Sequence, residues 1–270
     1  SPAFSKHNDD IYMNPALFSR VKKVYDDINS TDLTHEQKKV VEKIYKRFER
    51  NGANLNDADK ARLSQLNEEI SALQIQFSSN LLHETNNTFV TVDKLSDLEG
   101  LSQADIERAA EMAKEQGQEG KWMFNMQRTS CNPVLQYCKN RELRLKVYNA
   151  YCNRGNQGNE WDNKEICAKL VRLRLERAKL MGYKNCASQI LDTRMAKTPE
   201  AVYNLLDQIW APAVKKANEE LADIREEMKK DGRDCEPEGW DYRFYSERAR
   251  KAKFNFDESK LSEYLEINNV

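Results

Sequence analysis

Residues 198–230 read TPEAVYNLLDQIWAPAVKKANEELADIREEMKK, and this stretch decides the fold class. Thr198 followed by Pro199 is a typical helix start, because Thr caps free N–H groups and Pro fits the first helical position. Apolar residues then recur at the three- and four-residue spacing of one helix face: Val202, Leu205, Leu206, Ile209, Trp210, Val214, Leu221, Ile224 and Met228. Pro212 removes a backbone donor and should kink this helix. A helix of this length predicts a mainly helical domain.

Helix signals also mark the first part of the chain. Residues 1–14 look extended, and Asn14 then precedes a proline as the cap of a helix. Thr34 and Gln37 match a capping box, in which each residue satisfies a free backbone N–H of the other. Gly52 should stop the helix that follows, because glycine readily takes the left-handed conformation found just after helix ends.

Further helices are predicted along the rest of the chain. One starts near Asn56, and its apolar residues form a seam for packing against neighbouring helices: Leu63, Leu66, Ile70, Leu73 and Phe77. Asn132-Pro133 is expected to begin a short helix. Two more helices are predicted over residues 141–153 and 163–181.

Two short segments break the helical pattern. Residues 88–92 are β-branched and aromatic, as strands are, and residues 121–126 look like a second strand. A helix over residues 102–115 should lie between them in the sequence, with the two strands paired. The predicted fold class is mainly α, a multi-helix domain with one small two-stranded β-sheet.

The composition argues against a nucleic-acid-binding and a membrane-spanning protein. Among 270 residues the formal net charge is −1, whereas nucleic-acid-binding domains are usually clearly basic. No apolar run approaches the roughly 18 residues that a membrane span requires. We therefore expect neither a nucleic acid nor a membrane as partner. The first residues show no charged-then-apolar leader and no initiator Met, so a removed leader and a start inside the gene both remain open.

The cysteines point to a reducing compartment. There are six, and none forms a Cys-x-x-Cys pair, which disfavours a zinc knuckle or a dithiol redox site. We expect buried, reduced thiols, with Cys138 and Cys152 spaced to share one buried face. Reduced thiols favour the cytoplasm over the alternative, the periplasm.

The three histidines do not predict a metal site. His35 is followed by Glu36, but Lys39 stands where the second ligand of a zinc helix belongs. His83 likewise lacks a partner four residues on. His7 lies with Asp9 and Asp10 in one short segment, and a metal needs ligands that converge from several places. We therefore predict no catalytic, cofactor-binding or metal-binding residue in residues 1–270.

Two groups of basic residues are candidate anion-binding sites. The run Arg172, Arg174, Arg177 and Lys179 spreads around a helix and predicts a solvated face. Arg141 and Arg144 at a helix start are suited to hold a carboxylate bidentately. Salt bridges to Glu142 or to a neighbour are the alternative that we favour. No glycine-rich phosphate loop and no Gly-x-Ser-x-Gly motif is present.

Several segments together resemble the thimet oligopeptidase family of zinc metallopeptidases, and within it bacterial peptidyl-dipeptidases, with the oligopeptidase A branch as a near alternative. Their order and spacing run through essentially the whole chain. The segments are Lys6-His7-Asn8-Asp9-Asp10-Ile11 with Leu17–Val21, Phe48-Glu49-Arg50-Asn51-Gly52-Ala53-Asn54-Leu55, Asn140–Arg144 with Tyr148–Gly155, Ala178–Tyr183, Met195–Val202, and Trp240–Tyr245 with Arg248 and Lys253.

The resemblance implies two mostly helical halves around a deep channel that admits short peptides. Zinc sits at its floor on a His-Glu-x-x-His helix, where the metal activates water and the motif Glu acts as general base. Such a motif is absent from this sequence and would lie after Val270. Residues 1–270 would then form a central helical portion of the channel wall, between a missing N-terminal part and the zinc-binding part.

The resemblance therefore implies zinc and short peptide substrates for the intact enzyme, and no cofactor and no activity for these residues alone. Trp240, Tyr242 and Tyr245 are interpreted as packing and channel-wall residues, in an aromatic stretch that continues through Leu261, Tyr264 and Leu265. A helical face left bare should favour self-association. The alternative from another class is a non-enzymatic helical scaffold or peptide-binding module.

Overall fold

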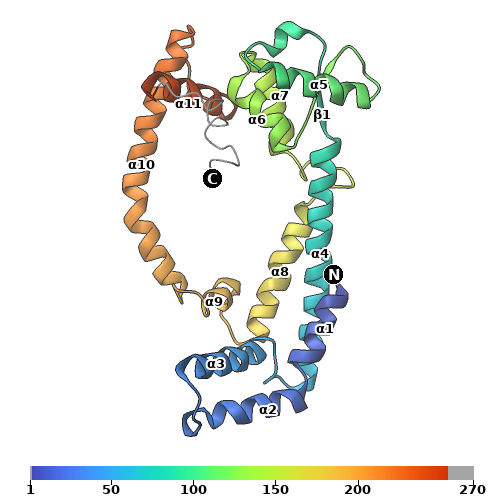
Figure 1. Cartoon of the computed structure of the whole chain (residues 1–270), viewed down its shortest axis with the longest axis vertical. Coiled ribbons are helices and arrows are strands. Elements are labelled where there is room, and N and C mark those ends of the chain that lie inside the picture. The colour runs from blue at the N-terminus through green and yellow to red at the C-terminus, as the bar shows by residue number, and fades with distance from the viewer. Residues whose placement is uncertain (1, 255–270) are drawn as a thin grey trace, which may run out of the picture. The chain divides into compact units, whose positions relative to one another are not determined.

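The computed structural model describes residues 2–254 and is mainly α-helical with one small sheet, as predicted (Figure 1). The α-helices of these residues are α1 (Pro2–Tyr12), α2 (Pro15–Asp26), α3 (His35–Arg50), α4 (Asp57–Asn87), α5 (Gln103–Glu115), α6 (Arg128–Tyr137), α7 (Arg141–Cys152), α8 (Lys164–Leu180), α9 (Cys186–Leu191), α10 (Pro199–Lys230) and α11 (Gly239–Phe254). The strands are β1 (Phe89–Val92) and β2 (Trp122–Asn125), and short 3-10 turns cover Ile28–Ser30 and Leu95–Leu98.

The chain divides into two compact units. Within the described residues, unit 1 holds 2–80 and 163–205, and unit 2 holds 81–162 and 206–254. Each unit therefore combines two separate stretches of sequence, and α4 and α10 contribute residues to both.

The larger core of unit 1 lies between α4 and α8. Leu66 and Ile70 of α4 are buried against apolar residues of α8: Ile166, Leu170 and Leu173. This confirms the predicted packing seam of α4. Complete burial of such a side chain stabilises a fold by about 1.5–3 kcal/mol, so this seam holds the two helices together.

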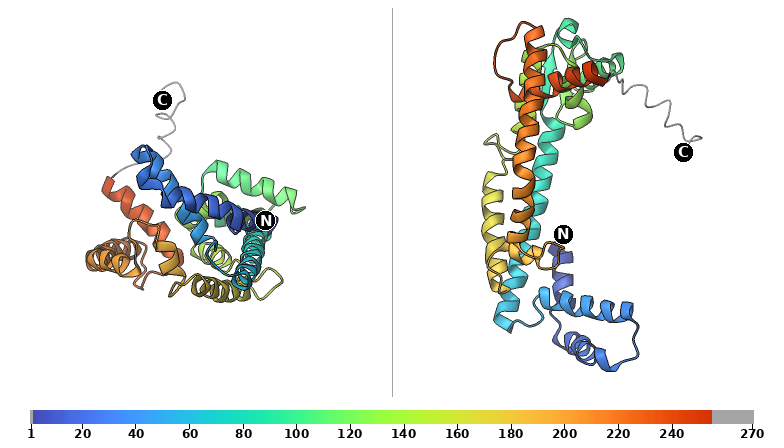
Figure 2. Two further views of the ribbon diagram at one scale, coloured as in Figure 1. Left: turned by 90° about the horizontal axis from the view of Figure 1, so that it is seen from below. Right: turned by 90° about the vertical axis from the view of Figure 1, so that its left-hand side faces the viewer.

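The first three helices of unit 1 form a smaller core. α2 and α3 lie side by side, with Phe18 stacked on Phe48 at a centroid distance of 5.9 Å (Figures 1 and 2). The Asn14 cap and the capping box of Thr34 and Gln37 are both formed. Gly52 follows α3 at φ 92°, a conformation that favours glycine, which confirms the predicted stop.

The prediction of an extended N-terminal segment is wrong, because residues 2–12 form α1. Long-range contacts stabilise this helix. The ring of Tyr12 packs edge-on against Phe48 at 5.0 Å, and the buried Asp9 accepts a hydrogen bond from Asn67 Nδ2 of α4 at 3.0 Å. Neither partner is near in sequence, so a local pattern did not reveal the helix.

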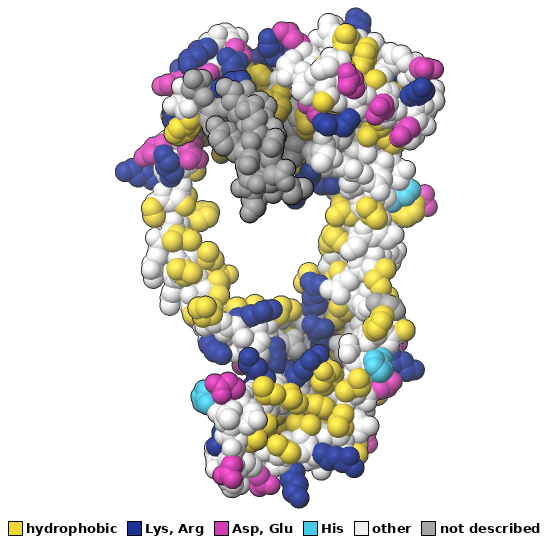
Figure 3. Space-filling model, viewed as in Figure 1, with side chains coloured by type: hydrophobic (Ala, Val, Ile, Leu, Met, Phe, Trp, Pro, Cys, Tyr) yellow, Lys and Arg dark blue, Asp and Glu magenta, His cyan; other side chains and the backbone are white. Residues whose placement is uncertain are grey.

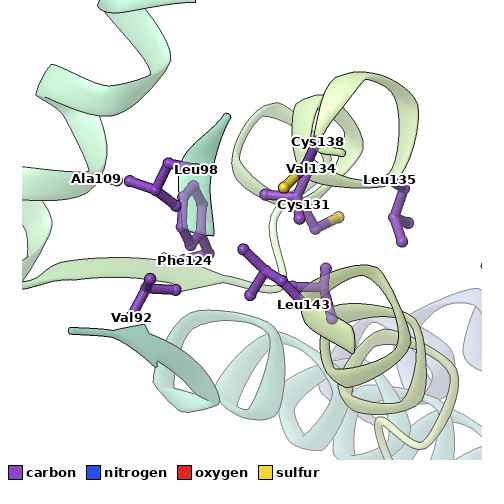
Figure 4. Packing of buried hydrophobic residues seen from close by; sticks show 10 residues of the cluster. Val92, Leu98, Ala109, Phe124, Cys131, Val134, Leu135, Cys138 and Leu143 are labelled. Atoms are coloured by element: carbon purple, nitrogen blue, oxygen red, sulfur yellow. The ribbon is translucent and has the colours of Figure 1, made fainter. Parts of the chain in front are cut away.

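Unit 2 contains the predicted strand pair. β1 and β2 are antiparallel, with Phe89 opposite Asn125 and Val92 opposite Trp122. The sheet packs on a core that α5, α6 and α7 share (Figure 4). Its buried members are Val92, Leu98, Ala109, Phe124, Cys131, Val134, Leu135, Cys138, Leu143 and Val147.

The predicted long helix is confirmed as α10, which spans Pro199–Lys230 with Pro212 inside it. The predicted start of a short helix at Asn132-Pro133 is wrong. α6 begins at Arg128 and contains Pro133 in its second turn, where proline removes one backbone donor. α9 was not predicted, because six residues are too few to show a period, although the Asn185 side chain caps it.

Candidate functional site

The two arginines considered as carboxylate binders do hold a carboxylate, and it belongs to this chain. Arg141 and Arg144 of α7 both bind Asp241, which lies in the first turn of α11. Arg141 Nη2 donates to Asp241 Oδ2 at 2.6 Å and its Nε donates to Oδ1 at 2.9 Å. Arg144 Nη2 donates to Oδ1 at 3.1 Å. We call these three residues the clasp.

Two of the three clasp residues are buried, Arg141 is half-buried, and the polar atoms of the buried pair have several hydrogen-bond partners. Asp241 is 0% exposed and Arg144 is 1% exposed. The remaining donors of Arg144 reach three backbone carbonyls, those of Cys138, Lys139 and Trp240, at 2.8, 3.2 and 3.1 Å. Its guanidinium also lies 4.1 Å from the centre of the Phe244 ring. Buried charges persist in proteins when they are paired and hydrogen-bonded in this way.

The pKa of Asp241 reflects this pairing. Burial alone would raise it, but hydrogen bonds from Arg141, from the Glu238 N–H and from Arg144 outweigh burial, so the pKa lies below its ordinary value of 3.8. The clasp therefore stays charged at neutral pH and fixes the start of α11 on α7. The prediction that both arginines form a salt bridge to a neighbour is correct in kind, and the acid is Asp241 instead of Glu142.

The histidines lie on helices, as predicted for His35 and His83. His35 is exposed at the start of α3. His83 of α4 stacks on Trp161 with ring centroids 3.8 Å apart. The adjacent Glu84 is buried and accepts hydrogen bonds from Asn159 Nδ2, at 2.7 Å, and from the Gly155 N–H. His83 and Glu84 of α4 thereby hold the segment that follows α7 in place.

His7, Asp9 and Asp10 do not converge. Asp9 is buried on α1 while His7 and Asp10 are exposed. Within residues 2–254, no three His, Cys, Asp or Glu side chains come together as possible ligands of a metal ion. The described residues do not fit a zinc site, so no step of peptide hydrolysis is assigned to them.

The predictions for the cysteines and for the basic run are partly wrong. Cys131 and Cys138 are buried, but Cys152, Cys167 and Cys235 are exposed and Cys186 is half-buried. Because Cys152 is exposed at the end of α7, Cys138 and Cys152 share no buried face. The reason is that a loop separates α6 from α7. In the basic run, Arg177 is half-buried because α8 packs on α4, and its Nε has no hydrogen-bond partner among the described residues. Burial lowers the pKa of Arg177.

A bare apolar surface lies on α10. Residues 203–220 of this helix are exposed throughout, and Figure 3 shows hydrophobic side chains along it. Trp210 is 70% exposed and Ile209 is 51% exposed. The other large members of this face are Tyr203, Leu205, Leu206 and Val214. The far end of α10 is different, because Ile224 and Met228 are buried against Phe244 and Tyr245 of α11.

The aromatic residues of α11 differ in how far they are buried. Tyr245 is 1% exposed and packs in the core, which confirms the packing role predicted for it. Trp240 is half-buried and packs edge-on against Tyr148 at 6.0 Å, whereas Tyr242 is 49% exposed. Leu261, Tyr264 and Leu265 lie outside the described residues.

Comparison with known proteins identifies the family. The sequence model of peptidase family M3 matches residues 134–270, which include both arginines and the aspartate of the clasp. This chain belongs to peptidase family M3.

Individual members of the M3 family match almost the whole chain. The dipeptidyl carboxypeptidase of Escherichia coli is 36% identical over 97% of this chain, which corresponds to 38% of that protein. Oligopeptidase A of Haemophilus influenzae is 28% identical over 100% of the chain and 40% of its own length. A probable cytosolic oligopeptidase A of Arabidopsis thaliana is 30% identical over 94% of the chain and 37% of its own length. The chain thus spans about two-fifths of these M3 relatives.

Two features of this M3 chain escaped the sequence reasoning. Asp241 was quoted in an aromatic stretch but not recognised as the partner of two arginines, because it is 100 positions from Arg141. A group of basic residues on α3 was not noticed, although its helical spacing is visible in the sequence.

None of the helices within residues 2–254 combines the length and apolar character of a membrane span.

Proposed function

We propose that this chain is part of a zinc peptidase that acts on short peptides and releases dipeptides from their C-termini. The observation that carries the proposal is the 36% identity to a dipeptidyl carboxypeptidase over 97% of the chain. The match to peptidase family M3 supports the same reaction class. It also favours a peptidase over a non-enzymatic helical scaffold.

In this proposal residues 1–270 supply framework and no catalytic group. The described residues contribute folded helical units whose buried charges, such as the clasp, are satisfied internally. The zinc implied by the family would supply Lewis-acid chemistry from residues outside this part of the protein. The chain alone is proposed to be inactive.

The bare face of α10 is consistent with this chain being part of a longer protein. Residues 203–220 are exposed, and their large apolar members form a wide bare face for one helix: Tyr203, Leu205, Leu206, Ile209, Trp210 and Val214. Because this chain spans only 38% of its dipeptidyl carboxypeptidase relative, we propose that further chain covers this face in the longer protein. In the isolated chain the same face would favour self-association.

A second candidate is an endopeptidase of the oligopeptidase A type. Relatives with that name reach 30% identity, in the Arabidopsis protein, so the margin between the two branches is modest. The Arabidopsis relative is named as cytosolic, and we propose a cytoplasmic location for this protein, with the periplasm as the alternative. Cell fractionation followed by immunodetection distinguishes the two compartments.

The reaction is tested on the purified full-length protein that contains this sequence. Its substrates are an N-acetylated nonapeptide with a free C-terminus and the same peptide with a C-terminal amide, and products are identified by mass spectrometry. We expect successive loss of dipeptides from the free acid, slower cleavage of the amide, and no cleavage after treatment with a metal chelator. Internal cleavage of both peptides would favour the oligopeptidase A alternative. Absence of any cleavage would refute the proposal.

A further inference from the structure

One face of α3 carries four basic residues. Lys43, Lys46, Arg47 and Arg50 stand at positions i, i+3, i+4 and i+7, so they form a single line along the helix, which we call the basic stripe. Like charges at these spacings repel one another and disfavour the helix. Negative charge close to the stripe would reduce this repulsion and stabilise α3.

The basic stripe lines a pocket inside unit 1. The pocket has a volume of about 570 Å³, and Figure 3 shows basic side chains gathered in this region near α3. Met181 and Tyr183 come from the segment after α8. Asp192, Thr193 and Lys197 come from the segment that joins α9 to α10. The volume suits a small ligand or a side chain of a larger one.

The floor of the pocket is held in one arrangement. Arg50 Nη1 donates to Asp192 Oδ2 at 2.7 Å and to the Tyr183 hydroxyl at 3.2 Å. Arg50 Nη2 donates to the Gln189 carbonyl at 2.7 Å. Because this network already pairs Arg50 with Asp192, neither is left to balance the other charges of the pocket.

The remaining cations of the pocket form no ion pair among the described residues, although Lys197 Nζ donates to the Asp192 carbonyl at 3.4 Å. Across residues 2–254, no ion pair involves Lys43, Lys46, Arg47 or Lys197. Glu49, the other acid of the pocket, accepts a hydrogen bond from Asn54 Nδ2 at 3.0 Å. The guanidinium of Arg47 is positioned over the Tyr12 ring, 4.6 Å from its centre. Five cations face two acids in this pocket, and one of those acids is already paired.

The backbone at Lys197 adds a second observation. Lys197 is at φ 64°, and no other non-glycine residue in the described chain has a positive φ. It is the centre of a three-residue turn that is closed by the Thr198 N–H donating to the Ala196 carbonyl at 2.7 Å. This conformation is strained for a residue with a side chain, and such strain is concentrated at ligand-binding sites. The turn brings a fifth cation to the pocket wall.

We propose that this pocket is an oxyanion site that binds a ligand bearing carboxylate or phosphate groups. Lys43, Lys46 and Lys197 supply ammonium donors, and Arg47 supplies a planar guanidinium. The excess of cations favours a ligand with two or more negative charges. This proposal does not depend on the proposed peptidase activity.

The test is a binding titration of the purified 270-residue chain by calorimetry at low salt. Inorganic phosphate is one probe, and N-acetyl-Glu-Glu-Glu-amide, which has only side-chain carboxylates, is the other. We expect at least one of them to bind with one-to-one stoichiometry, and added salt to weaken the binding. Binding of phosphate alone assigns a phosphate ligand, and binding of the peptide alone assigns a carboxylate ligand.

Three variants make the test specific. K43Q/K46Q removes two exposed cations and should weaken binding about tenfold or more, which corresponds to about 1.4 kcal/mol. K43R/K46R keeps the charges and should restore binding. K38Q is the matched control, since Lys38 lies on α3 but does not line the pocket. The proposal is overturned if neither probe binds, or if K38Q weakens binding as much as K43Q/K46Q. Circular dichroism checks that each variant is folded.

Discussion

The clasp of unit 2 and the basic stripe of unit 1 use the same kinds of side chain in opposite settings. In the clasp, Arg144 and Asp241 are buried and every charge has a partner. In the basic stripe, Lys43 and Lys46 are exposed and form no ion pair within residues 2–254. Satisfied buried charges serve the fold, because leaving one unpaired in the interior is costly. Unsatisfied surface charges remain available for a ligand.

The largest expected effect is the loss of the clasp's carboxylate. D241N leaves two arginines, one of them fully buried, without their counter-charge and should cost about 3–5 kcal/mol of unfolding free energy. Urea denaturation followed by circular dichroism measures this loss. The control E236Q removes the carboxylate of the exposed Arg225–Glu236 pair and should leave the midpoint nearly unchanged. Equal effects of the two variants would show that the clasp is not the stabilising feature described.

The second prediction concerns self-association through α10. The isolated chain should sediment faster as its concentration rises, because the face with Ile209 and Trp210 is bare. I209E places a charge on that face and should weaken association about tenfold, or about 1.4 kcal/mol. Q208E adds the same charge next to it on the helix, away from the apolar face, and should have little effect. A wild-type chain that stays strictly monomeric at high concentration would contradict the prediction.

The third prediction uses two buried carboxylates with opposite pKa shifts. The pKa of Asp241 is lowered, so its stabilising contribution is present above 3.8 and is lost as the pH falls through the lowered value. The pKa of Asp9 is raised, mainly by burial, with hydrogen bonds from Ser64 and Asn67 opposing it and the charges of Glu68 and Asp10 adding to it. Ionised Asp9 therefore costs stability, and its contribution improves as the pH falls from neutral towards 3.8.

Urea midpoints between pH 3 and pH 7 test these two signs. D241N should flatten the acid-side loss of stability that the wild-type chain shows. D9N should remove the opposing gain and leave a steeper loss. The assignment fails if both variants change the pH profile in the same direction.

The comparison also shows what the sequence could predict. Helix spacing and caps placed most elements, including the α4 seam with Leu66 and the strand pair, because those signals are local. The ion-pair partner of Arg141 could not be predicted, because Asp241 is 100 positions away and several other acidic residues could pair with Arg141 equally well. α1 was missed for a similar reason, since its support comes from Phe48 and Asn67. The basic stripe was local and visible, but an exposed charge pattern alone does not reveal whether it is paired.

The smallest expected effect is on the stability of the basic stripe itself. K43Q/K46Q relieves repulsion along α3 and should raise the unfolding free energy by about 0.3 kcal/mol at low salt, with no gain at high salt. Thermal unfolding at the two salt concentrations measures the difference. K38Q gives the baseline for losing one lysine from the same helix. A clear loss of stability in K43Q/K46Q would mean that the stripe has internal partners after all.

We propose that these residues form a non-catalytic part of an M3 peptidase. The most direct measurement is the zinc content of the purified 270-residue chain together with dipeptide release from an N-acetylated peptide, with the full-length protein as the positive control. We predict substoichiometric zinc and no dipeptide release by the chain, and release by the full-length protein. One zinc per chain together with dipeptide release by the 270-residue chain alone would contradict the claim.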